Sequence, residues 1–128
     1  MIVVDTSVWV AALRHAAGSH AKVLQQLIDA DEVGLAVPVR IELLSGASRS
    51  DRPRLRRALT ALPVLCPTDD TWTTIDRWVS RAGEHGERFG FGDLLIGALA
   101  VENGALMWSL DADFARMEKL KLIERYEP

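Results

Sequence analysis

The sequence predicts an α/β fold: a three-layer α/β/α sandwich with a central, mostly parallel sheet. Short apolar runs of strand length alternate with longer helical patterns along the whole chain. The run at 2–4 is β-branched and continuously apolar, which is typical of a strand buried on both faces. The segment 93–103 is apolar on most sides, as expected of a buried helix. The 128 residues predict a single domain, 1–128, that folds without disulfide or metal staples.

The first half of the chain predicts two strand–helix units. The strand at 2–4 runs into Asp5-Thr6-Ser7, and residues of these types cap helices well. Gly18 separates two helices, and Pro38 suits the first turn of a later helix. In order, we expect a strand at 2–4, helices at 8–14 and from 19, a strand at 33–37 and a helix at 38–45.

The second half continues the alternation. Pro67 closes a short apolar run, and Gly104 suits the position just after a helix. Glycines make 83–92 the most flexible stretch by composition. We expect a helix at 49–62, a strand at 64–66, a helix from 69 or 70, a helix at 93–103, a strand at 105–110, a short helix at 115–119 and an edge strand at 120–126.

Composition excludes several functional classes. The formal charge is −3, from 18 acids and 15 bases, which by itself argues against a general nucleic-acid coat protein. The single cysteine, Cys66, allows no internal disulfide or zinc cluster, and we expect it to be buried. No signal peptide and no apolar stretch of about 20 residues is evident, so we expect no membrane association and a cytoplasmic location.

Acidic residues recur at the junctions between predicted strands and the helices that follow them. Asp5 follows the first strand, and Asp111 and Asp113 follow the strand at 105–110. Glu42 lies about one turn into the helix after the second strand, and Asp93 opens the apolar helix. Because ligands of open α/β sheets bind at the carboxyl ends of strands, we expect these acids to meet at one edge.

Each acid alone also has a purely structural explanation. Asp5 and Asp93 could cap helices, and Asp111 and Asp113 could be turn residues. Glu42 has apolar neighbours, so we expect it to be largely buried, with Arg40 as a possible partner.

Together the acids favour a metal site. Carboxylates gathered at one edge repel one another, and a hard divalent cation relieves that repulsion. Mg²⁺ and Mn²⁺ prefer oxygen ligands, and such ions can activate water for attack on a phosphodiester. The sequence contains no Ser-His-Asp arrangement and no P-loop lysine that would indicate another chemistry.

Four segments, in this order, carry a resemblance to a known family. They are Ile2-Val3-Val4-Asp5-Thr6-Ser7-Val8-Trp9, Ile41-Glu42-Leu43-Leu44-Ser45-Gly46, Gly92-Asp93-Leu94-Leu95-Ile96-Gly97-Ala98-Leu99-Ala100 and Ser109-Leu110-Asp111-Ala112-Asp113-Phe114. Over nearly the whole chain the sequence resembles the PIN-domain family, and within it the VapC-type toxin ribonucleases of bacterial toxin–antitoxin pairs.

The resemblance implies an Mg²⁺- or Mn²⁺-dependent endoribonuclease. Asp5, Glu42, Asp93 and Asp111 would be the catalytic, metal-binding acids, with Asp113 as a further metal ligand. Family members place the fourth acid at either of two positions, so Asp113 is the alternative to Asp111, which is favoured because it lies nearer the strand end. Thr6 or Ser7 would help to hold the first carboxylate or the metal's water. The resemblance also implies structured RNA substrates such as tRNA or rRNA, a homodimer, and a heterotetramer or larger assembly with a VapB-type antitoxin.

A basic segment follows the Glu42 helix. We expect its arginines to guide the RNA backbone, although a solvated helix face is an equally good explanation. The residues concerned are Arg49, Arg52, Arg54, Arg56 and Arg57. The four tryptophans favour core or interface positions over base stacking, with Trp9 or Trp72 at a dimer or antitoxin interface.

Two other functional classes compete with the nuclease. A catalytically inactive PIN-like domain would only bind RNA or protein, but it would have no need of four repelling carboxylates. A phosphatase of the dehalogenase type would carry a second acid two residues after Asp5, where Ser7 stands. A receiver domain would need adjacent acids early in the chain and a later lysine, and neither is evident.

Overall fold

A computed structural model describes all residues, Met1–Pro128, and contains a four-stranded sheet in the order β3-β2-β1-β4. All three strand pairings are parallel, with Val3 opposite Gly34 in β2 and opposite Met107 in β4. The strands are β1 (Ile2–Val4), β2 (Val33–Ala36), β3 (Val64–Leu65) and β4 (Leu106–Trp108). The predicted α/β class with a parallel sheet is therefore confirmed.

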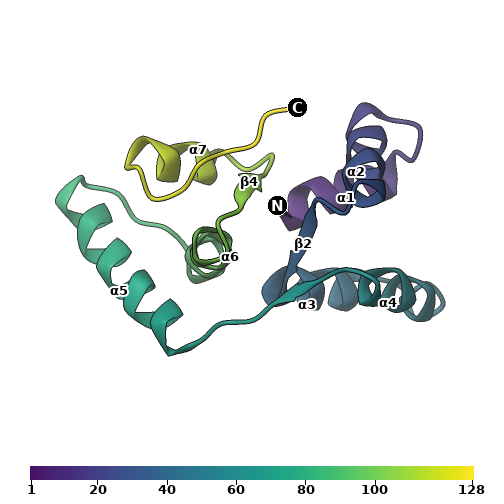
Figure 1. The fold of residues 1–128 in the computed structure, drawn as a ribbon, viewed down its shortest axis with the longest axis horizontal. Helices are drawn as coiled ribbons and strands as arrows, with labels where there is room; N and C mark the ends of the chain where they lie inside the picture. Colours follow the sequence, from purple (N-terminus) through teal and green to yellow (C-terminus); the bar gives the residue numbers. More distant parts are fainter.

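Seven helices connect and cover these strands. They are α1 (Thr6–Arg14), α2 (Ser19–Asp29), α3 (Val37–Gly46), α4 (Arg52–Thr60), α5 (Asp69–Glu84), α6 (Phe91–Glu102) and α7 (Ala112–Lys119). Figure 1 shows α1 and α2 on one side of the strands and α5 and α6 on the other, which gives the three predicted layers. No helix is both long enough and apolar enough to cross a membrane.

The core lies where α6 packs between the sheet and the outer helices. Every residue of α6 from Leu94 to Ala100 is buried, and β1 is buried along its whole length. Gly97 permits this packing, because a Cβ there would lie 2.9 Å from Met117 Cε and 3.2 Å from Trp78. The continuous apolar pattern of these two segments therefore reflects burial on more than one face.

Several predicted boundaries are wrong by a few residues. Helix α4 begins at Arg52 rather than 49, because a turn held by the Ser48 side chain precedes it. It ends at Thr60. Helix α6 begins at Phe91, so Asp93 lies within its first turn instead of capping it. Helix α7 begins at Ala112, immediately after Asp111, three residues earlier than expected.

The predicted edge strand at 120–126 is not a strand. This segment forms one isolated parallel bridge, between Met107 and Arg125, and the rest runs without regular pairing. Its apolar residues Leu122 and Ile123 are both buried, so their pattern reflects packing in the core and not pairing within the sheet.

The expectation for Cys66 is also wrong, because its side chain is exposed just beyond the end of β3. The tryptophans follow the core expectation more closely. Trp9, Trp78 and Trp108 are buried, whereas Trp72 is 46% exposed and stacks on Phe91.

Candidate active site

Asp5 lies between β1 and α1, where it caps the helix from a buried position. Its Oδ2 accepts hydrogen bonds from Ser7 Oγ at 2.7 Å and from Ser109 Oγ at 2.8 Å, with the Ser7 amide at 3.4 Å. None of these donors reaches Oδ1. The carboxylate is thus fixed on one oxygen and free of protein donors on the other.

The same two serines join the β1–α1 corner to the end of β4. Ser7 Oγ accepts a hydrogen bond from the Leu110 amide at 3.0 Å, and Ser109 Oγ accepts one from the Asp111 amide at 2.9 Å. Each hydroxyl therefore donates to Asp5 and accepts from the backbone that leads into α7. Ser109 had no predicted role, although its place two residues before Asp111 could have indicated one.

Asp93, Asp111 and Asp113 form a compact acidic group. One carboxylate oxygen from each lies within 4.8 Å of the others, although Asp93 is in the first turn of α6 and the other two are at the start of α7. Asp111 caps α7 by accepting a hydrogen bond from the Asp113 amide at 2.9 Å. The structure thus brings together three of the predicted acids from α6 and α7.

The charges in this group are not balanced. Burial raises the pKa of Asp93 to about 7, assisted by a hydrogen bond with Asp113 and by the negative charges of Asp111 and Asp5. The Arg116 guanidinium, by contrast, holds the pKa of Asp113 below its usual range. Asp93 is therefore only partly ionised near neutral pH.

Glu42 lies apart from the three-acid group, on α3. It is exposed rather than buried, and its Oε2 accepts a hydrogen bond from Thr6 Oγ1 instead of pairing with Arg40. The burial expected from its apolar neighbours is wrong because Ile41 beside it is also exposed. Glu42 Oε1 nevertheless lies 3.9 Å from where a Cβ on Gly92 would stand, next to Asp93.

The donor chemistry of this edge fits a hard divalent cation. Apart from Arg116, the side chains that converge on it offer carboxylate or hydroxyl oxygen, the ligand type that Mg²⁺ and Mn²⁺ prefer. Burial and the neighbouring carboxylates both raise the pKa of Asp93, and a bound cation would favour its ionised form. Asp5 Oδ1 supplies a further oxygen without a protein partner.

The predicted basic segment divides into two kinds of arginine. Arg52 donates from Nε to the Leu44 carbonyl at 2.9 Å and from Nη2 to the Ala47 carbonyl at 3.1 Å, so it closes the end of α3. The other four arginines, Arg49, Arg54, Arg56 and Arg57, are exposed. Arg54 has one carboxylate neighbour, Asp51, at 3.8 Å.

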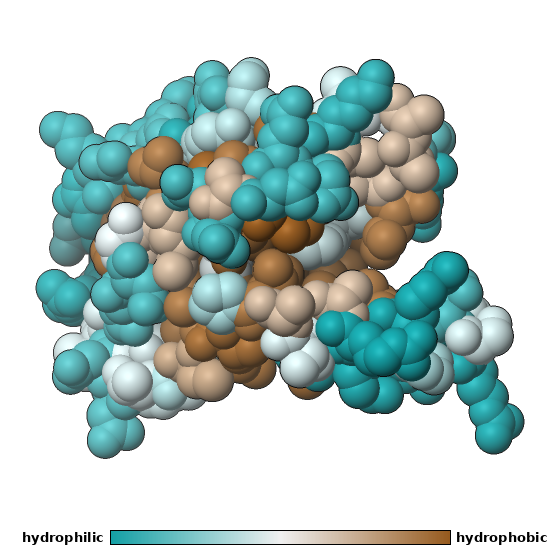
Figure 2. All heavy atoms as spheres, turned by 45° about the vertical axis from the view of Figure 1, so that its right-hand side comes forward, coloured by the Kyte–Doolittle hydropathy of each residue, from teal (hydrophilic) through white to brown (hydrophobic).

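A hollow leads from Glu42 toward this segment. A cavity of about 280 Å³ is lined by Arg14, Glu42 and Leu55, and an adjoining one of about 550 Å³ reaches Arg54. Figure 2 shows the hydrophilic surface of the arginine-rich helix at the lower right, separated by a notch from a more apolar surface above it. Glu42 and Arg54 thus lie along one connected hollow.

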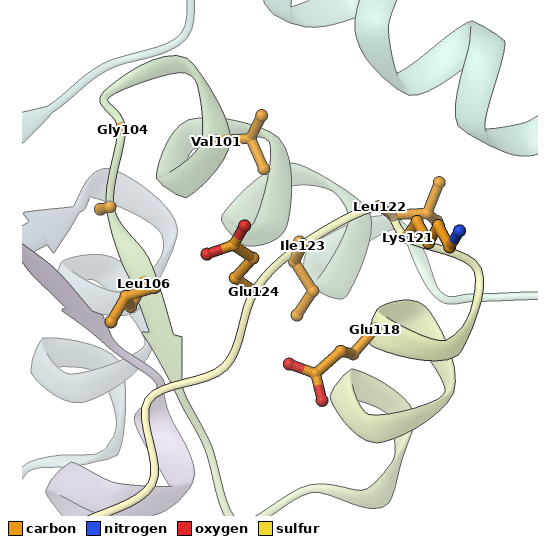
Figure 3. Close-up of a pocket in the computed structure, with 9 residues that line it drawn as sticks. Val101, Gly104, Leu106, Glu118, Lys121, Leu122, Ile123 and Glu124 are labelled. Carbon is orange, nitrogen blue, oxygen red and sulfur yellow. The ribbon is translucent and has the colours of Figure 1, made fainter.

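Another cavity lies elsewhere, at the opposite end of the sheet. Its volume is about 570 Å³, and it lies beside Gly104 and Leu106, where β4 begins. Figure 3 shows Glu118 and Glu124 directed toward this space. Glu118 is already paired with Arg125, and none of the predicted site residues lines the cavity.

Comparison with known proteins gives consistent matches. The model of the family described as "PIN domain" matches residues 2–120. "Ribonuclease VapC11" of Mycobacterium tuberculosis is 37% identical over 122 residues, covering 89% of each chain.

Solved structures agree at the level of the fold. A chain of VapBC2 from Rickettsia felis aligns with a TM-score of 0.79 at 17% identity over 98% of each chain. That complex is bound to a DNA fragment from its own promoter. VapBC-5 from Mycobacterium tuberculosis, a member of a family of toxin–antitoxin systems, aligns with a TM-score of 0.72 at 25% identity over 98% of this chain and 97% of that one.

Proposed function

The chain belongs to the PIN-domain family, and from that premise we propose that it is a VapC-type toxin, an endoribonuclease that uses Mg²⁺ or Mn²⁺ to hydrolyse RNA phosphodiester bonds. The relatives named as VapC ribonucleases support the ribonuclease activity, and the VapBC complexes support a role in a toxin–antitoxin pair. The observation that carries the metal dependence is the convergence of Asp93, Asp111 and Asp113 beside Asp5.

The proposed roles follow from how each acid is held. Asp5 would bind a cation through Oδ1, because two serine hydroxyls already occupy Oδ2. Asp93 and Asp111 would complete the site from α6 and α7, and Asp93 would lose its proton when a cation enters. When bound, the ion supplies Lewis acidity that activates water and offsets the charge developing on the phosphate.

Glu42 and Thr6 would act at the substrate side of this site. The Thr6 hydroxyl orients the exposed Glu42 carboxylate, and the hollow lined by Glu42 continues toward the exposed arginines. Arginine forks bind phosphates well, so Arg54 and Arg56 would hold the RNA backbone as it approaches the acids. Arg52 would contribute to folding instead, because its donors are already satisfied by α3.

We further propose a VapB-type antitoxin as partner, and a homodimer that assembles with it into a heterotetramer or larger complex. The VapBC structures support the antitoxin. An apolar surface that includes Leu13 and Leu55 adjoins Glu42, so a bound antitoxin segment would cover the approach to the acids.

The test is cleavage of total RNA by the purified chain in EDTA, Mg²⁺ or Mn²⁺. We expect cleavage only with a metal, and a loss of about 100-fold or more for Asp5→Asn, Asp93→Asn and Asp111→Asn, since each removes charge that the reaction requires. Asp76→Asn, which changes an exposed acid on α5, is the matched control and should keep its activity.

Three outcomes would overturn the proposal or part of it. Cleavage in EDTA would exclude the metal mechanism, and full activity of the three site variants would exclude these acids. Binding of RNA without cleavage under any metal condition would favour the catalytically inactive PIN-like domain. The cleaved species, tRNA or rRNA, would identify the substrate class.

A further inference from the structure

Arg116 makes contacts that none of the proposed roles uses. It lies on α7, one turn after Asp113, and its Nη2 donates to Asp113 Oδ1 at 2.6 Å. Its Nη1 donates to Glu87 Oε2, and its guanidinium lies over the Phe89 ring, 4.8 Å from the ring centre. Both terminal nitrogens and one face of the guanidinium are thus in contact with other side chains.

These contacts join the two corners that carry the acidic group. Glu87 and Phe89 belong to the segment that leads from α5 into α6, whose first turn bears Asp93. Phe89 is 7% exposed, so the segment is anchored where Arg116 reaches it. One guanidinium therefore fixes Asp113 on α7 relative to the entrance of α6.

The negative charges around Asp113 explain why its contact with Arg116 matters. Asp113 faces two other carboxylates within 4.8 Å, and Arg116 is the only cation paired with any of the three. Without that pairing, repulsion would turn Asp113 away from Asp93 or leave it protonated. A planar fork suits this place because it holds two carboxylates at once, which an ammonium group does less well.

We propose that Arg116 is a positioning residue that aligns Asp113 opposite Asp93 and so sets the geometry of the metal-binding oxygens. This inference rests on the proposed function, because it requires a cation at the acidic group. Arg116 touches neither the metal nor the RNA and acts through Asp113.

The test is Mn²⁺ affinity, measured from the six-line EPR signal of free Mn²⁺ during titration, with folding checked by circular dichroism. We expect Arg116→Gln to weaken Mn²⁺ binding about tenfold or more, as is typical when a partner of a metal ligand is removed. Arg116→Lys should recover part of the affinity, because an ammonium can pair with Asp113 but cannot hold Glu87 as well.

The matched control is Arg125→Gln. Arg125 also contacts two carboxylates, those of Glu118 and Glu127, but at the C-terminal segment away from the acids. We expect this variant to bind Mn²⁺ within twofold of the unchanged protein. If Arg125→Gln weakens Mn²⁺ binding as much as Arg116→Gln does, a general structural effect explains both and the proposal is wrong.

A double-mutant cycle shows whether Arg116 acts through Asp113. We expect Asp113→Asn to weaken Mn²⁺ binding, and Arg116→Gln to add less than a twofold change in that background. Independent effects of the two substitutions, or no effect of Arg116→Gln alone, would overturn the proposal. If the unchanged protein binds no Mn²⁺, the failure lies with the proposed metal site itself.

Discussion

Two corners of the sheet edge carry acids, and they are held in opposite ways. At the β1–α1 corner, Asp5 is buried and accepts hydrogen bonds from two serine hydroxyls. At the α6–α7 corner, Asp93 lies near two further carboxylates, and burial together with these neighbours raises its pKa to about 7. Hydrogen bonds stabilise the charged form of Asp5 at the first corner, whereas burial and neighbouring carboxylates disfavour the charged form of Asp93 at the second.

The difference indicates how a metal site can be both prebuilt and responsive. Hydrogen bonds to the ionised form fix Asp5 before any ligand arrives. The unbalanced charge at Asp93 would instead be relieved by the ligand, so part of the cation's binding energy comes from removing repulsion. The two corners should therefore respond with opposite signs when their acids are neutralised in the absence of metal.

The largest expected effect is at the first corner. Asp5→Ala should lower the free energy of unfolding by about 2 kcal/mol in EDTA at pH 7, because it removes the cap of α1 and the shared acceptor of Ser7 and Ser109. Urea unfolding measures this change. Asp76→Ala on the exposed face of α5 should differ from the unchanged protein by less than about 0.5 kcal/mol. An Asp5→Ala variant of unchanged stability would show that the serine network contributes nothing to folding.

The second corner should give a smaller effect of opposite sign. An acid whose folded pKa is raised from 3.8 to about 7 lowers stability as pH rises through that range, because the folded state must give up a proton that it binds tightly. Asp93→Asn should thus raise the free energy of unfolding on the order of 1 kcal/mol at pH 8 in EDTA, a value reduced by solvent screening at this half-buried group.

The pH dependence sharpens this second prediction. The advantage of Asp93→Asn should shrink toward pH 5, where the unchanged protein keeps its proton. Added Mn²⁺ should then stabilise the unchanged protein more than the variant. Urea unfolding at both pH values, with and without metal, measures these differences. An Asp93→Asn variant that is less stable than the unchanged protein at pH 8 in EDTA would contradict the predicted cost of ionising Asp93.

The smallest expected effect extends the comparison to the arginines. Arg54→Ala combined with Arg56→Ala should weaken RNA binding about threefold at 150 mM salt and flatten its salt dependence, with little change in stability, because both side chains are exposed. Arg52→Ala should instead cost about 1 kcal/mol of stability, since two α3 carbonyls lose their donor.

Fluorescence anisotropy in EDTA, where cleavage is suppressed, measures the RNA affinity of these variants. Equal RNA affinity and equal salt slopes for the unchanged protein and the double variant would remove the guiding role. Loss of RNA affinity in a stable Arg52→Ala variant would show that this side chain leaves α3 to bind RNA.

Local patterns predicted the elements well where burial is continuous. The runs at 2–4 and 93–103 became β1 and α6 because residues apolar on every side have few other places in a small domain. The segment 120–126 shows the limit of such patterns. Its apolar residues are buried in the core as those of a strand would be, but only Arg125 forms a bridge with β4.

The candidate site was predicted unevenly for a similar reason. The positions of Asp5, Asp93, Asp111 and Asp113 at helix starts are local features, so the sequence could place them at one edge. The burial of Glu42 could not be inferred from apolar neighbours, because α3 exposes Ile41 as well. The role of Arg116 depends on Glu87, which lies 29 residues earlier in the chain.

The sequence by itself determined the fold class, the acids and the family, because strand and helix patterns, capping residues and motif order are local properties of the chain. Only the tertiary structure decided which oxygens meet, which acid has a raised pKa and which arginine already has hydrogen-bond partners. Those outcomes depend on distances and burial between segments far apart in the chain, and electrostatic interactions between carboxylates change steeply with both.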